Sequence, residues 1–181
     1  MSEKYNIFGG MRRGNRINGS ANYFREIGKS LTDMMLSLAE CYETEAYYLN
    51  KKGYVCEDEC KAAPILRKYN ADINEKALLT FQSLLLQPLE SSNNKLIGQA
   101  AEVTMVISRF KDPTGVDLLL EALQTWSRVK GLCRDGVYSW VIKALGEMCD
   151  VRALQSLTNA LQDDSPLVRK EAQEALSKLR V

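Results

Sequence analysis

Aromatic and basic side chains gather between residues 125 and 138, and this is the segment best suited to bind a partner. Trp126 stands close to Arg128, Lys130 and Arg134, and Tyr138 follows shortly after. An indole beside basic groups can stack on a nucleic-acid base and hold a phosphate. The same residue types are favoured at protein hot spots, and Trp126 can also pack between helices. These three interpretations stay open, and we predict the five residues as the partner contact set.

A second group of basic residues lies near the start of the chain. The segment "GGMRRGNRINGS" holds Arg12, Arg13 and Arg16 among glycines and has no apolar periodicity. Residues 1–30 contain six basic and two acidic side chains, a net of +4, while the whole chain carries +1. We predict a flexible basic arm over residues 1–20. It is either a solvated terminus or an accessory clamp for nucleic-acid phosphates or an acidic partner.

The sequence offers no catalytic constellation. It contains no histidine, which excludes serine–histidine and cysteine–histidine nucleophile pairs, histidine-ligated metals and an imidazole base. Cys56 and Cys60 are separated by three acidic residues, and a soft-metal site of this kind usually needs four ligands. We therefore predict no metal and no cofactor, and we favour a non-enzymatic role.

Composition is typical of a cytoplasmic protein of ordinary size. The five cysteines are an odd number in a chain that shows no export signal, which predicts reduced thiols. No stretch approaches the roughly 20 apolar residues of a membrane span. A net charge of +1 gives no global attraction to nucleic acid or to an anionic membrane.

Apolar residues at a spacing of three and four recur at a 38-residue period, which indicates a repeat array. The three sets are Leu78, Phe81 and Leu85; Val116, Leu119 and Leu123; and Leu154, Leu157 and Leu161. A second apolar stripe follows each set, so each copy is predicted to be a helix pair. Copies at about 74–111, 112–149 and 150–181 can bury a continuous core only by stacking. The predicted fold is an all-α solenoid.

The last copies resemble a known family. The stretches "IKALGEMCDVRALQSL" and "LQDDSPLVRKEAQEALSKL" are similar to HEAT repeats, and most similar to the short bacterial and archaeal type called phycobilisome-lyase-like. The resemblance implies a right-handed α-solenoid whose second helices line a concave binding surface. Tyr138 stands where the family prefers arginine, which departs from an Arg–Asp ladder between repeats.

Residues 21–73 are predicted to form an N-terminal helical cap on the first repeat. Apolar residues at helical spacing from Phe24 to Leu49 predict one long amphipathic helix, or two with a break near Gly28. A loop and a short helix near Ile65–Tyr69 follow. Trp140, in the middle of the second helix of its copy, is predicted to belong to the core.

These features favour a non-enzymatic adaptor or scaffold that binds a partner protein on its concave face. One alternative is a nucleic-acid-binding protein that uses the basic arm and resembles the HEAT-like alkylpurine DNA glycosylases. A further alternative, suggested by the name of the repeat type, is a chromophore-lyase-like subunit. Fold resemblance by itself licenses none of these roles.

Overall fold

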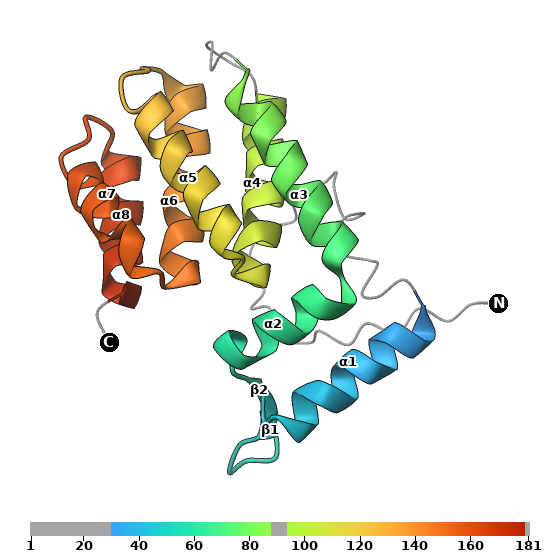
Figure 1. Ribbon diagram of the computed structural model, residues 1–181. Coiled ribbons are helices and arrows are strands. Elements are labelled where there is room, and N and C mark those ends of the chain that lie inside the picture. Colours follow the sequence, from blue (N-terminus) through green and yellow to red (C-terminus); the bar gives the residue numbers. More distant parts are fainter. Residues whose placement is uncertain (1–29, 88–93, 180–181) are drawn as a thin grey trace.

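The repeat region is an array of three helix pairs, as the 38-residue period predicts. The computed structural model describes residues 30–87 and 94–179. The first helices stand side by side on one face and the second helices lie behind them (Figure 1). The pairs are α3 (Ala71–Leu85) with α4 (Asn94–Phe110), α5 (Pro113–Trp126) with α6 (Leu132–Met148), and α7 (Leu154–Ala160) with α8 (Pro166–Leu179).

Helix starts follow the capping residues of the sequence. The Asp112 carboxylate accepts a hydrogen bond of 2.9 Å from the Thr114 amide, and Pro113 occupies the first turn of α5. Asp150 caps a short 3-10 turn, Val151–Ala153, in the same way before α7 begins. These caps fix where each new repeat starts.

A continuous core runs through the array. The stripe positions Phe81, Leu119, Leu145, Leu157 and Val168 are each fully buried. The second helices α4, α6 and α8 pack against one another far more extensively than the first helices α3, α5 and α7 do. The array therefore curves toward the second helices, and their outer surface forms its concave face.

The close contact between α6 and α8 depends on a glycine, Gly146, which has no side chain. A Cβ atom added at Gly146 of α6 would lie 2.6 Å from the Cα atom of Ala175 in α8. No ordinary side chain fits in that space, so α6 and α8 are as close there as their backbones allow.

The N-terminal part differs from the predicted long helix. Helix α1 spans Leu31–Glu43, is capped by Ser30, and ends well before residue 50. The chain turns at Glu45, whose φ of 57° lies in the left-handed region. Residues after this turn form a two-stranded antiparallel hairpin of β1 (Tyr47–Leu49) and β2 (Val55–Glu57). The prediction of helix up to residue 50 was wrong because this turn interrupts an apolar pattern that continues through it.

Helix α2 (Glu59–Tyr69) is longer than the predicted short helix and packs on α4. It starts early because the Asp58 carboxylate accepts hydrogen bonds from the amides of Cys60 and Lys61. The Arg67 guanidinium of α2 donates to the carbonyls of Phe110 and Lys111 at the end of α4. Together α1, the hairpin and α2 sit beside the first repeat (Figure 1). No helix in the described ranges is long and apolar enough to span a bilayer.

Candidate partner-binding surface

The predicted contact set divides into buried and exposed members. Trp126, Arg134 and Tyr138 are only 3%, 3% and 5% exposed, whereas Arg128 and Lys130 are exposed in the turn between α5 and α6. The Trp126 ring packs edge-on against Phe81, with ring centroids 6.2 Å apart. Of the three interpretations of Trp126, packing between helices is the one that describes its position.

Arg134 ties the second repeat to the third. Its guanidinium donates to both carboxylate oxygens of Asp163, at 2.9 and 2.6 Å, and its Nε donates to the Trp126 carbonyl. The guanidinium also stacks 3.9 Å above the Tyr138 ring. Burial lowers the pKa of Arg134, but the hydrogen bonds that its guanidinium donates to the Asp163 and Asp135 carboxylates outweigh burial and raise it. An Arg–Asp link between repeats therefore exists, one helical turn before Tyr138.

A groove of about 510 Å³ lies between the α5–α6 and α7–α8 turns. The ammonium group of Lys130 lies 2.7 Å from the Asp164 carboxylate, and this ion pair joins the two turns. The polar groups deeper in the groove already bind one another, since Arg134 holds Asp163 and the Tyr138 hydroxyl donates to the Leu123 carbonyl. The polar residues of this groove therefore connect the second repeat to the third.

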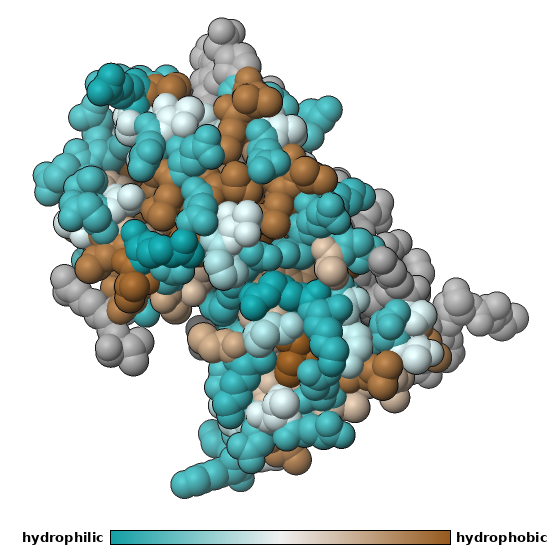
Figure 2. All heavy atoms as spheres, in the orientation of Figure 1, coloured by the Kyte–Doolittle hydropathy of each residue, from teal (hydrophilic) through white to brown (hydrophobic). Residues whose placement is uncertain are grey.

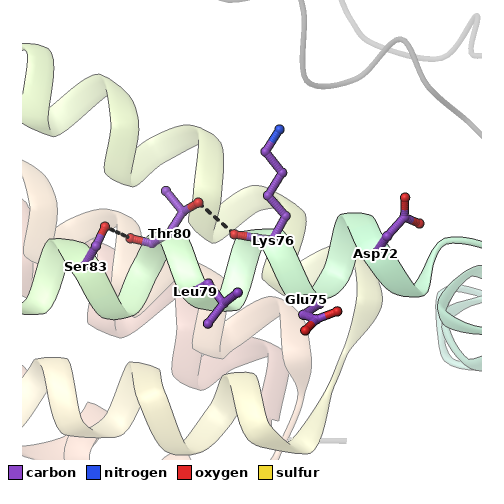
Figure 3. Close-up of a pocket in the computed structure, with 6 residues that line it drawn as sticks. All are labelled: Asp72, Glu75, Lys76, Leu79, Thr80 and Ser83. Carbon is purple, nitrogen blue, oxygen red and sulfur yellow. Dashed lines mark hydrogen bonds between the residues drawn. The ribbon is translucent and has the colours of Figure 1, made fainter.

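A second depression, of about 410 Å³, runs along the outer side of α3. Figure 3 shows that its side chains spread away from one another and do not converge on one point. The hydroxyls of Thr80 and Ser83 donate to carbonyls of their own helix. The described residues that line it are Asp72, Glu75, Lys76, Leu79, Thr80 and Ser83.

The face that carries the first helices is chemically mixed. Figure 2 shows apolar side chains interspersed with polar ones over α3 and α5. Leu79 and Leu86 of this region are 58% and 87% exposed. Scattered exposed apolar residues are normal on a protein surface.

The side chains on the concave face are arranged more regularly, because the second helices lie in register. Lys111 and Cys149, both left-handed with φ of 48° and 54°, end α4 and α6 at positions 38 residues apart. The Ser108 hydroxyl lies 3.1 Å from a Glu147 oxygen, and Lys178 of α8 lies 3.7 Å from the other. Residues 38 apart in α4 and α6, and 31 apart in α6 and α8, therefore stand at about the same height.

This register places three rows of side chains on the concave face. All nine side chains are partly or fully exposed. The rows are Glu102, Trp140 and Glu171; Met105, Lys143 and Glu174; and Arg109, Glu147 and Lys178. In the third row the charged groups are already paired, Arg109 with Glu57 at 2.5 Å and Lys178 with Glu147.

Trp140 occupies the centre of this face, and its predicted place in the core was wrong. The side chain is partly exposed, and the Lys143 ammonium lies 4.8 Å from the centroid of its ring. Sequence reasoning missed it because an apolar residue in an interior repeat was expected to be covered. The signal that could have found it is Glu171, which occupies the equivalent position in the last repeat.

The cysteines form no metal centre in the described structure. All five are free thiols, and no group of three or more possible ligands is placed to hold a metal ion among residues 30–87 and 94–179. Burial raises the pKa of Cys41. The predicted basic arm, with Arg12, Arg13 and Arg16, lies outside the described residues.

Comparison with protein-family models supports the repeat assignment. The model described as HEAT repeats matches residues 83–177, which is more than half of the 181 residues. The match begins near the end of α3 and extends into α8. No curated protein and no solved structure matches the sequence significantly. The chain belongs to the HEAT-repeat family.

Proposed function

We propose that this chain is a non-catalytic adaptor that binds a partner protein on its concave face. The observation that carries the proposal is Trp140, which is partly exposed at the centre of that face. Repeat proteins use such extended concave surfaces for binding, and tryptophan is the residue type most enriched among interface hot spots. The in-register rows on α4, α6 and α8 supply the polar surroundings that an interface rim needs.

The predicted contact residues have two roles in this proposal. Arg128 and Lys130 are exposed and contribute charge at the edge of the array. The other three residues, Trp126, Arg134 and Tyr138, are almost fully buried and so have little surface to offer a partner. Their role in the proposal is to hold the turn that carries Arg128 and Lys130. The buried Trp126 ring cannot stack on a base, so the nucleic-acid alternative keeps its basic residues but loses this aromatic one.

Two finer assignments belong to the same proposal. The repeat is of the short bacterial and archaeal type, supported by the spacings of 38 and 31 residues between equivalent second-helix positions. The protein acts in the cytoplasm, supported by five free thiols.

The test compares native capture by matched variants. The tagged chain is used to capture its partner from its own cells, and the partner is identified and its affinity measured with purified proteins. Trp140→Ala is expected to weaken binding by at least about 30-fold, which corresponds to a hot spot of about 2 kcal/mol. Tyr54→Ala, on the 66% exposed Tyr54 of the hairpin, is the control and should bind normally.

Two results would overturn the proposal. One is a partner whose affinity is the same for the wild type and for Trp140→Ala. The other is the capture of nuclease-sensitive nucleic acid without a protein, which would favour the nucleic-acid alternative.

A further inference from the structure

The Trp140 ring already binds a cation. The Lys143 ammonium, one turn along α6, lies 4.8 Å from the ring centroid. Lys143 is exposed, and a cation–π contact at an exposed site is weak. The ring face is therefore suited to a positive charge, and the cation now beside it is held weakly enough to be displaced.

A carboxylate side chain stands on the neighbouring helix on each side of the ring. Glu102 of α4 and Glu171 of α8 occupy the positions equivalent to Trp140 on the two neighbouring helices. Both are partly exposed. Neither carboxylate has an ion-pair or hydrogen-bond partner in the described part of the chain. Packed helix axes lie about 8–10 Å apart, so a cationic group above the ring comes within reach of both glutamates.

The next row continues this pattern. It holds Met105, Lys143 and Glu174, and Glu174 lies 3.7 Å from Lys170 of its own helix. The first two rows together contain three acidic residues and one basic residue, a net of −2, or −1 when Lys170 beside Glu174 is counted. Met105 adds a partly exposed, adaptable apolar group beside Trp140. The surface is complementary to a segment that combines positive charge with apolar side chains.

We propose that the concave face binds a basic segment of the partner protein, with an arginine or lysine over Trp140 and between Glu102 and Glu171. Arginine suits the site best, because its planar guanidinium stacks on aromatic rings and donates to carboxylates at its edges. This inference rests on the proposed function and adds the chemistry of the partner to it.

Synthetic peptides and calorimetric titration test the inference on the full chain. The probe is a 14-residue helical peptide of leucine and arginine, with twins in which arginine is replaced by glutamate or glutamine. The arginine peptide is expected to bind, and the glutamate peptide is not. The double variant Glu102→Gln/Glu171→Gln should lose about tenfold or more in affinity for the arginine peptide.

A control pair removes the same charge elsewhere. Glu75→Gln/Glu121→Gln changes two exposed glutamates on the first-helix row and should leave the affinity unchanged. Trp140→Phe should keep most of the preference for the basic peptide, whereas Trp140→Leu, which keeps apolar surface but has no ring, should lose it. Circular dichroism confirms that each variant retains its helices.

Three results overturn the inference. The first is equal binding of the arginine and glutamate peptides. The second is an equal loss of affinity in the control pair. The third is binding that appears only after Arg12, Arg13 and Arg16 are changed to Gln, which would assign the site to the chain's own basic segment. If Trp140→Ala abolishes capture of the native partner while the peptides show no charge preference, this inference fails and the proposed function stands.

Discussion

The Asp163 carboxylate neutralises a guanidinium that has almost no access to water. Arg134 is 3% exposed and bonds both oxygens of Asp163. Without Asp163 the buried guanidinium keeps only the Asp135 carboxylate, at 3.2 Å, as a charged partner, and breaking a buried ion pair costs up to about 3 kcal/mol. We expect Asp163→Asn to lower the free energy of unfolding by about this amount in urea denaturation. Asp164→Asn, at the 84% exposed neighbour, should leave the free energy of unfolding nearly unchanged.

The Asp163 carboxylate should also make the stability of the fold depend on pH in the acidic range. Burial by itself would raise the pKa of Asp163, but hydrogen bonds from Arg134 and from the Ser165 amide outweigh burial and lower it. The folded pKa lies below the unfolded one, so this stabilisation is complete above the unfolded pKa of about 3.9 and is lost as pH falls through the folded value. The melting-temperature difference between wild type and Asp163→Asn should shrink below about pH 4. A constant difference down to pH 2 would contradict it.

Tyr47 should make stability depend on pH in the opposite direction, with stability lost as pH rises. Burial, with the nearby Glu57 carboxylate, raises the pKa of Tyr47 to about 12. The folded pKa exceeds the unfolded value of about 10, so stability is complete below pH 10 and falls as pH rises toward 12. Burial also raises the pKa of Tyr138, so in an absorbance titration at 295 nm wild type should show one more late-ionising phenol than Tyr47→Phe. A Tyr47 that ionises at pH 10 would show that the ring is not buried in solution.

At the scale of elements, the contact between α6 and α8 is set by Gly146. Because an added Cβ would meet the Ala175 backbone at 2.6 Å, Gly146→Ala must push the helices apart and should cost about 1–3 kcal/mol. Gly98→Ala in α4 is the matched control, since nothing lies within 4 Å of its added Cβ. It should stabilise by about 0.5–1 kcal/mol because alanine favours the helix. Equal effects in thermal unfolding would contradict this packing.

Helices built on regular apolar spacing could be predicted from the sequence. The second-helix residues Val137, Val141 and Leu145 are all buried, as their spacing predicts. The hairpin could not be predicted, because three-residue strands leave too short a pattern and Tyr42–Leu49 continues the helical spacing of α1. The left-handed turn at Glu45 has no glycine to mark it.

The candidate site was harder to predict than the fold. The aromatic and basic pattern around Trp126 identifies residue types, but it does not show which of these side chains become buried in the fold. Arg134 is buried because Asp163, 29 residues later, meets it across the repeat boundary. Trp140 is partly exposed because it faces outward between Glu102 and Glu171, a relation that only the register of three helices defines.

At the scale of the whole molecule, the polar contacts between the N-terminal part and the array, among the described residues, gather at the end of α4, where Arg109 pairs with Glu57 and Lys111 with Glu59. Arg67 bonds the carbonyls at the end of α4, so Arg67→Ala should increase hydrogen exchange in α1, the hairpin and α2 while leaving α6 and α8 protected. Lys68→Ala is the control, because Lys68 pairs with Glu40 inside the N-terminal part. Uniform loss of protection along the chain would show that the two parts unfold as one unit.

The contact at Gly146 also gives the array a mechanical direction. Tighter curling would drive the backbones of α6 and α8 into each other, and closely packed atoms resist compression steeply. Opening only separates surfaces, and the first helices, which pack more loosely, can follow by small sliding motions. We therefore expect the array to widen more readily than it tightens. If the proposed function holds, the concave face should admit a bulky partner segment more readily than it closes around a thin one.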